Sequence, residues 1–141
     1  MHDIVIVGGG PGGYAAALYA HNYGLSVAMV EKERPGGTCL IRGCIPAKQY
    51  LQVAEVMSTV THASDFGVIT ELPSLDWEAA KNRKNQTVEG LVNGLSGLLK
   101  KRNVEILNGY GRLLGGGKVE VDLAGENRTL ERQAVLLASG S

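Results

Sequence analysis

Two cysteines are the residues of this chain whose type and spacing point most directly to chemistry. Cys39 and Cys44 are the only two cysteines among 141 residues, and four residues stand between them. A loop of this length can close a small disulfide ring, because the glycines at positions 36, 37 and 43 let the backbone turn tightly around it. The pair is therefore a candidate for thiol–disulfide chemistry, and an inert bridge or two free thiols are the alternatives.

The residues after the second cysteine predict a helix that begins close to it. Pro46 is well accommodated in the first turn of a helix, and apolar side chains recur at helical spacing up to about residue 61. This places Cys44 near a helix N-terminus, where the partial positive charge stabilises a thiolate. Lys48 stands four residues later on the same helix face. It is a candidate cation beside the thiolate, and a solvated surface lysine is the alternative.

The start of the chain predicts the strand–helix–strand unit of a dinucleotide-binding fold. A β-branched strand, an alanine-rich helix and a second strand are expected at residues 3–7, 14–23 and 25–30. Between the first strand and the helix the chain reads Gly8-Gly9-Gly10-Pro11-Gly12-Gly13, which contains GxGxxG.

Each glycine of this pattern has a physical role in such a unit. Gly8 permits the tight turn, Gly10 lets backbone N–H groups approach a pyrophosphate, and Gly13 lets the helix pack close to the strand. Glu31, 18 residues after Gly13, is placed to accept hydrogen bonds from a ribose diol. A purely structural unit is the alternative, and the pattern by itself does not separate FAD from NAD.

Composition excludes several other classes of function. A chain of 141 residues with 44% apolar content and zero net charge suits one globular domain and gives no electrostatic grip on nucleic acid. No apolar run reaches the roughly 20 residues of a membrane span, and the apolar start at residues 4–7 is too short for a signal peptide. We therefore expect a cytoplasmic protein with no membrane association. The three histidines lack metal-ligand spacing, so no metal site is expected.

The second half of the chain predicts a long helix and then a β-meander. Asp76 is a plausible N-cap, and a stripe of mostly apolar side chains follows it; the stripe is Trp77, Ala80, Lys84, Val88, Leu91, Leu95 and Leu98. Gly90, Gly94 and Gly97 form one smooth face, which indicates either close packing against a partner subunit or a locally frayed helix. Strands are expected at residues 104–114 (broken at 109–111), 118–123, 128–130 and 134–138.

The segment from Gly36 to Lys48 resembles the redox-active disulfide segment of the flavoprotein disulfide reductases, among them dihydrolipoamide dehydrogenase, glutathione reductase and mercuric reductase. Leu40 and the run Cys44-Ile45-Pro46 resemble the dihydrolipoamide dehydrogenase branch most closely. Two positions depart from the pattern, because Ile41 and Ala47 stand where the family usually has asparagine and serine. The resemblance implies an α/β fold, a Rossmann-like FAD-binding fold with a central parallel sheet and an antiparallel β-meander.

The resemblance also implies which residues act. The catalytic residues are expected to be Cys39, Cys44 and Lys48, and FAD is expected to lie in the first dinucleotide fold. Gly111 would touch its adenine end, and the terminal run from Ala138 to Ser141 would close over it. The expected FAD-binding residues are Gly8, Gly10, Pro11, Gly13, Glu31, Lys32, Gly37, Thr38, Cys39, Lys48, Gly111, Ser139 and Gly140.

The implied reaction passes electrons from a dithiol through the disulfide to FAD and then to NAD. The substrate would attack Cys39, expected to be the more exposed sulfur, and release Cys44 as a thiolate against the flavin. The implied partners are a small dithiol, or the lipoyl domain of a 2-oxo acid dehydrogenase complex, and a second copy in a homodimer.

The resemblance spans the whole chain but only the opening part of the family. Residues 1–141 are expected to be the FAD-binding domain, without the NAD and dimerisation domains, and to be inactive alone. Two alternatives stay open: a non-catalytic folded fragment or binding module without bound flavin, and part of a related disulfide reductase of the glutathione or mercuric reductase type.

Overall fold

The computed structural model describes residues 1–140, and Ser141 lies outside this range. Its strands make one sheet with the order β3-β2-β1-β6-β5-β4. The strands are β1 (His2–Val7), β2 (Val27–Glu31), β3 (Glu105–Asn108), β4 (Tyr110–Gly115), β5 (Lys118–Asp122) and β6 (Asn127–Leu137). The helices are α1 (Pro11–Asn22), α2 (Gly37–Ile41), α3 (Cys44–Thr61), the 3-10 helix η1 (Ala63–Phe66) and α4 (Trp77–Lys101).

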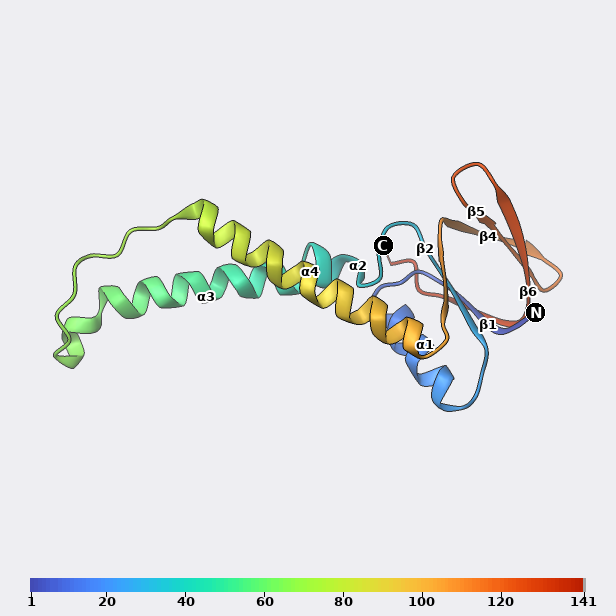
Figure 1. Cartoon of the computed structure of the whole chain (residues 1–141), viewed down its shortest axis with the longest axis horizontal. Helices are drawn as coiled ribbons and strands as arrows, with labels where there is room; N and C mark the ends of the chain where they lie inside the picture. Colours follow the sequence, from blue (N-terminus) through green and yellow to red (C-terminus); the bar gives the residue numbers. More distant parts are fainter. Residues whose placement is uncertain (141) are drawn as a thin grey trace.

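The expected α/β fold is confirmed, with a parallel half and an antiparallel half. Strands β3, β2, β1 and β6 are parallel, and Ile4 of β1 pairs with Val27 on one side and Ala134 on the other. Strands β4, β5 and β6 are antiparallel, as expected for the meander. Figure 1 shows the meander at the same end of the molecule as the parallel strands, away from the far ends of α3 and α4.

Strand β6 belongs to both halves. Residues 127–131 pair with β5, and residues 132–137 pair with β1. The two separate strands expected at 128–130 and 134–138 are therefore one continuous strand of 11 residues. The polar run between them does not break the strand but carries it from one neighbour to the other. The break expected at 109–111 is found at Gly109 alone, since β3 ends at Asn108 and β4 begins at Tyr110. A Cβ on Gly109 would overlap the carbonyl oxygen of Asp122.

Strands β1 and β2 are largely buried on both faces and divide the core in two. Val5 packs toward the meander, in a cluster with Val119, Val121 and Leu130. The next residue, Ile6, packs toward α1 and α4. Neighbouring residues of one strand point to opposite faces of a sheet, so continuous apolar runs are expected when both faces are covered. This explains why β1 and β2 read as unbroken apolar strands.

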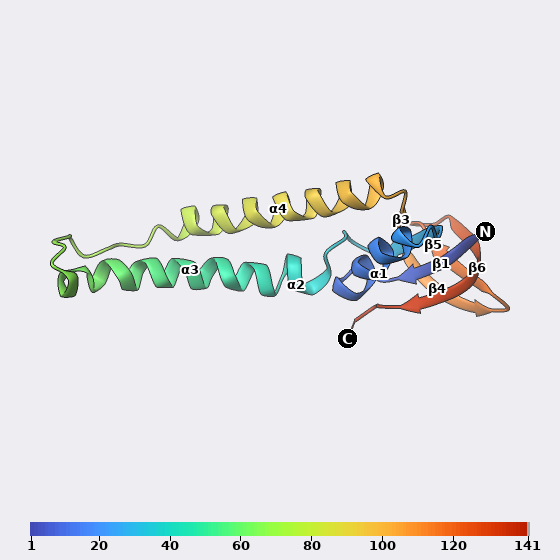
Figure 2. The same ribbon diagram turned by 90° about the horizontal axis from the view of Figure 1, so that it is seen from below.

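Helices α3 and α4 form an arm that projects from the sheet (Figure 1 and Figure 2). Asp76 is the N-cap of α4 as expected, with Oδ1 accepting from the N–H of Ala79 at 2.9 Å. The expected apolar stripe is partly wrong: α4 buries Val88, Val92 and Leu99, whereas the predicted Leu91 and Leu98 are 43% and 41% exposed. Over 25 residues, a small error in the assumed angle between successive side chains shifts the predicted buried face of the helix. The buried residues of α4 also lie only from Val88 onward.

The arm has little cover in the described part of the chain. Helix α3 buries none of its residues, and η1 buries none either. On α4, a Cβ added at Gly90, Gly94 or Gly97 would meet no neighbouring atom within 4 Å, and the helix runs through these glycines without a break. The frayed-helix alternative is therefore wrong, and packing against a partner stays a prediction. Among the helices of residues 1–140, none has the length and apolar content needed to cross a bilayer.

Shortening the buried side chain of Leu130 tests whether the meander and the parallel sheet unfold as one unit. Leu130 is 3% exposed, so we expect Leu130→Ala to lower the free energy of unfolding by about 2–5 kcal/mol. Leu114→Ala removes the same atoms from a side chain that is 51% exposed and is expected to change it by less than about 0.5 kcal/mol. Urea denaturation followed by circular dichroism measures both. Equal effects would show that the meander does not share the core.

Candidate functional site

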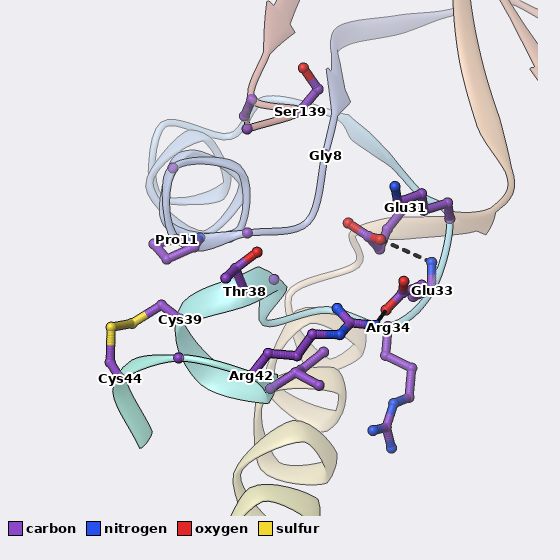
Figure 3. A pocket seen from close by; sticks show the side chains of 18 residues that line it. Gly8, Pro11, Glu31, Glu33, Arg34, Thr38, Cys39, Arg42, Cys44 and Ser139 are labelled. Atoms are coloured by element: carbon purple, nitrogen blue, oxygen red, sulfur yellow. Dashed lines mark hydrogen bonds and ion pairs between the residues drawn. A yellow bond between two sulfur atoms is a disulfide. The ribbon is translucent and has the colours of Figure 1, made fainter. Parts of the chain in front are cut away.

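A cavity of about 750 Å³ opens at the carboxyl ends of β1, β2 and β6 (Figure 3). Helix α1 follows β1 toward β2, whereas β6 lies on the other side of β1, so the strand order reverses there. In open α/β sheets, ligands bind at this kind of switch point. The lining residues come from the glycine turn, the end of β2, the α2 segment and the chain after β6; they are Gly8, Gly10, Pro11, Gly12, 31–34, 37–39, 41–44 and 138–140.

Backbone contacts at glycines shape the floor of this cavity. Gly8 has a φ of +110°, and a Cβ there would overlap the carbonyl oxygen of Ala138. A Cβ on Gly13 would in turn overlap the carbonyl oxygen of Gly8. The tight turn and the close helix–strand packing that the sequence predicts for Gly8 and Gly13 are therefore present. Gly13 itself is buried beneath the turn and does not line the cavity.

The N-terminus of α1 faces the cavity without a side-chain cap. Gly10 is the N-cap residue and Pro11 is at the first helical position, with no acidic side chain in the first turn. Helix N-terminal amides that lack a cap carry partial positive charge and suit an anion such as a pyrophosphate. Gly37 lies directly against this turn, since a Cβ on Gly37 would meet the Cα of Gly10 at 2.6 Å. Two glycine turns thus bring α2 to the start of α1.

Glu31 is held by two backbone amides at the end of β2. Its Oε2 accepts from the N–H of Gly9 at 2.6 Å, and its Oε1 accepts from the N–H of Glu33 at 2.9 Å. A carboxylate has about four acceptor positions, so these two bonds leave capacity for a ligand hydroxyl. Glu31 is partly buried and lines the cavity, which is the place that the sequence pattern assigns to it.

Cys39 and Cys44 form a disulfide at the edge of the same cavity, with their Cα atoms 4.7 Å apart. Cys39 lies within the short helix α2, which the sequence did not predict, and Cys44 is the first residue of α3, as expected. The expectation that Cys39 is the more exposed of the two is wrong for this structure: Cys39 is half-buried and Cys44 is exposed. Cys39 packs beside Gly43, whereas Cys44 heads α3 at the rim of the cavity.

The other predicted site residues divide into two groups. Lys32, Thr38, Ser139 and Gly140 line the cavity with the residues already described, and Thr38 points its hydroxyl into it (Figure 3). Lys48 lies outside the lining, exposed on α3, and has no ion pair within residues 1–140. Its role therefore stays a prediction.

Gly111 also lies outside this cavity. It sits on β4 over the parallel sheet, where a Cβ would meet the side chain of Val7 at 3.0 Å. It lines a separate hollow of about 350 Å³ with its neighbour Tyr110. The ring centroid of Tyr110 is 6.0 Å from Nζ of Lys32, so β4 approaches the rim of the main cavity. A direct cofactor contact by Gly111 stays a prediction.

Sequence reasoning missed the charged residues around Glu31. Glu33, Arg34 and Arg42 all line the cavity. Arg42 forms an ion pair with Glu33, and Arg34 forms one with Glu89 of α4 at 2.9 Å. The hydrogen bond from Arg42 holds the pKa of the Glu33 carboxyl below its usual value. Residues 33 and 34 directly follow the predicted ribose-binding acid, which is the one signal that could have marked them.

Comparison with known proteins places these features in a family. The family described as pyridine nucleotide-disulphide oxidoreductase matches residues 2–141. The dihydrolipoyl dehydrogenase of Acholeplasma laidlawii is 46% identical over 141 residues, and the match covers 99% of this chain and 41% of the relative. A dihydrolipoyl dehydrogenase of Bacillus subtilis is 44% identical over 149 residues, covering 99% of this chain and 31% of the relative.

A solved structure shows the same fold. The Cu(II) complex of the HOCl-induced flavoprotein disulfide reductase RclA from Escherichia coli matches with a TM-score of 0.82 at 24% sequence identity. The match covers 99% of this chain and 28% of that one. The chain therefore spans well under half the length of the relatives and the structure that it matches.

The close packing of Gly13 against the carbonyl oxygen of Gly8 can be tested by adding a Cβ at Gly13. An alanine within a helix is ordinarily more stable than glycine by about 1 kcal/mol. Gly13→Ala is nevertheless expected to lower the free energy of unfolding by about 1–3 kcal/mol, because its Cβ displaces the turn. Gly94→Ala, on an open face of α4, is the matched control and is expected to raise it by about 0.5–1 kcal/mol. Denaturant titration measures both, and stabilisation by Gly13→Ala would refute the close packing.

Proposed function

Because the chain belongs to the pyridine nucleotide-disulphide oxidoreductase family, we propose that it is the FAD-binding, disulfide-bearing portion of a dihydrolipoyl dehydrogenase-like oxidoreductase. One observation carries the proposal. A disulfide and the glycine turn of a dinucleotide-binding fold line the same cavity, and Gly37, two residues before Cys39, lies against Gly10 of that turn. A dinucleotide seated on the turn would therefore reach the disulfide.

The residues present suit FAD. The uncapped amides at the start of α1 would receive the pyrophosphate, and Glu31 would accept hydrogen bonds from a ribose. At Gly8 and Gly37 a Cβ would overlap neighbouring backbone atoms, and Gly10 leaves the backbone bare at the start of α1. Lys32, Thr38, Ser139 and Gly140 complete the wall as proposed contacts. FAD, when bound, would supply the two-electron acceptor that passes electrons on to NAD.

The disulfide would exchange with a substrate dithiol in two balanced steps. A substrate thiolate attacks Sγ of Cys39, the Cys39–Cys44 bond breaks, and Cys44 leaves as a thiolate. The second substrate thiol then attacks its own sulfur in the mixed disulfide and releases Cys39, which leaves the substrate as a disulfide and the protein as a dithiol. The start of α3 stabilises the Cys44 thiolate, and Lys48, four residues on, is proposed to add a second positive charge.

The exposure of the two cysteines is the reverse of the one expected for this division of roles, because Cys44 is the more exposed sulfur. Cys44 is open toward the cavity and would be covered by a ligand seated there, whereas Cys39 lies within α2. The proposed roles therefore require a bound dinucleotide to cover Cys44 more than Cys39, although both cysteines line the cavity.

The partners and the cellular location of the protein are also proposals, and they rest on the proposed chemistry and on the names of the relatives. The relatives' name, dihydrolipoyl dehydrogenase, supports a dithiol substrate, either a small molecule or a lipoyl domain of a 2-oxo acid dehydrogenase complex. The uncovered arm and the glycine face of α4 support a homodimer. A disulfide that cycles during catalysis suits a reducing compartment, so we place the protein in the cytoplasm. Since the chain spans 41% and 31% of two relatives, turnover with NAD is not expected of it alone.

Visible absorption of the purified chain mixed with FAD tests the proposal. We expect a flavin band that stays with the protein through gel filtration and gains a long-wavelength shoulder when one equivalent of dithiol is added, because the Cys44 thiolate then lies beside the flavin ring. Cys39→Ser leaves Cys44 unpaired and should show the shoulder without dithiol, whereas Cys44→Ser should never show it. A protein that stays colourless would support the alternative, a folded module that holds no flavin.

A further inference from the structure

The loop after β2 contacts both ends of the cavity through one residue, Glu33. Its backbone N–H donates to Oε1 of Glu31 at 2.9 Å, and its carbonyl accepts from Nδ2 of Asn108 at 2.9 Å. Its carboxylate pairs with the guanidinium of Arg42. Arg42 follows the last residue of α2 and stands two residues before Cys44. Glu33 therefore touches the predicted ribose-binding acid on one side and the disulfide turn on the other.

The geometry points to a positioning pair: we propose that Arg42 and Glu33 hold the Glu31 carboxylate and the Cys39–Cys44 turn in one fixed relation, so that the ribose end and the disulfide end of the cavity act as one site. In Figure 3 the side chain of Arg42 runs along the cavity toward Glu33, which lies beside Glu31. The identity of the ligand rests on the proposed function, whereas the coupling between the two ends is a property of the chain itself.

The exposure of the pair indicates that its main role is not stability. The side chains of Arg42 and Glu33 are 57% and 42% exposed, and ion pairs this open contribute little to folding. Both side chains nevertheless line the cavity, so a ligand seated there would exclude water from them. A lower local dielectric strengthens an ion pair. The pair should therefore matter more for ligand binding than for the stability of the empty protein.

A rival role for Arg42 is direct contact with a ligand phosphate. Arginine is well suited to phosphate, and Arg42 would have to leave Glu33 to reach one. The two roles differ in the expected sign of a change at Glu33. If Arg42 positions the turn through Glu33, losing either partner weakens binding. If Arg42 binds phosphate, removing the Glu33 charge frees the guanidinium and tightens binding.

A double-mutant cycle on FAD affinity separates these roles. We expect Arg42→Met and Glu33→Gln each to weaken FAD binding by at least about two- to fivefold, because the coupling of an exposed pair is the lower limit once a ligand excludes water. The double variant should be no weaker than either single one, since the two changes break the same interaction. Arg42→Lys, which keeps the charge, should recover most of the loss. Tighter binding by Glu33→Gln, or additive losses, would overturn the proposal.

Another Arg–Glu pair of this chain supplies the matched control. Arg128 pairs with Glu105 at 2.6 Å, with side chains 46% and 36% exposed, and neither residue lines the cavity. Arg128→Met removes the same kind of pair and the same charge as Arg42→Met. It is expected to leave FAD affinity unchanged. Equal weakening by both variants would mean that net charge, and not the link between Glu33 and Arg42, sets the affinity.

The pH dependence gives a readout that a merely structural role would not move. The hydrogen bond from Arg42 lowers the pKa of Glu33, and the charges of Lys32 and Arg34 act in the same direction. A carboxyl with a lowered pKa contributes its interaction above its ordinary pKa and loses it as the pH falls through the lowered value. The affinity ratio of the native chain to Arg42→Met should therefore be largest near neutral pH and fall toward one in acid. A ratio that stays constant would contradict the pairing.

Amide hydrogen exchange tests the coupling without any cofactor. The N–H groups of Gly9 and Glu33 both donate to Glu31, at the end of the cavity away from Cys44. Arg42→Met should speed the exchange of these two amides about two- to fivefold, whereas Arg128→Met should not. If the native chain did not bind FAD, the proposed function would fail. The exchange rates would still show whether Arg42 and Glu33 couple the two ends of the cavity. Unchanged exchange at Gly9 and Glu33 would overturn this coupling.

Discussion

Contact between backbones at glycines is the constraint on which this site depends. Gly8 touches the carbonyl of Ala138, Gly13 touches the carbonyl of Gly8, and Gly37 touches the Cα of Gly10. These contacts join the turn after β1, the start of α2 and the chain after β6. No side chain fits between them, so the position of each segment is fixed by the others. The disulfide is placed beside the glycine turn after β1 because α2 starts at Gly37.

The charges around the cavity follow from the same arrangement. The lining carries three cationic side chains, Lys32, Arg34 and Arg42, and two anionic ones, Glu31 and Glu33. Each acid has donors to satisfy it: backbone amides for Glu31 and a guanidinium for Glu33. A lining with one more cationic than anionic side chain, open to the uncapped amides of α1, suits an anionic dinucleotide. The family match and the relatives' names agree with this interpretation of the site.

Local sequence signals predicted the parts of the fold that local physics determines. The β1-α1-β2 unit, the position of Cys44 at the start of α3 and the Asp76 cap all depend on residues close together in the chain. The glycine turn is predictable for the same reason. The disulfide could be suspected because its two residues are the only cysteines, and they stand in a flexible loop.

Some features could not be predicted from the sequence because they depend on contacts between distant segments or on the exact face that a helix buries. The continuity of β6 arises from a change of partner between β5 and β1, which no local pattern encodes. The predicted apolar stripe of α4 is wrong at Leu91 and Leu98, because tertiary packing determines which of several neighbouring helix faces is buried. The pairing of Glu33 with Arg42 joins two charged residues that each read as ordinary surface side chains. The short helix α2 was hidden by the glycines around it.

The arm shows where the described chain is least covered. Helix α3 buries no residue, although it begins at the disulfide. At its first residue, Cys44, α3 faces the cavity in which we propose that FAD binds. A crystal structure of the chain grown with FAD tests this central claim most directly. We predict a ribose hydroxyl on Glu31 and the flavin ring in van der Waals contact with Sγ of Cys44. A flavin ring turned to solvent, away from Cys44, would contradict this claim.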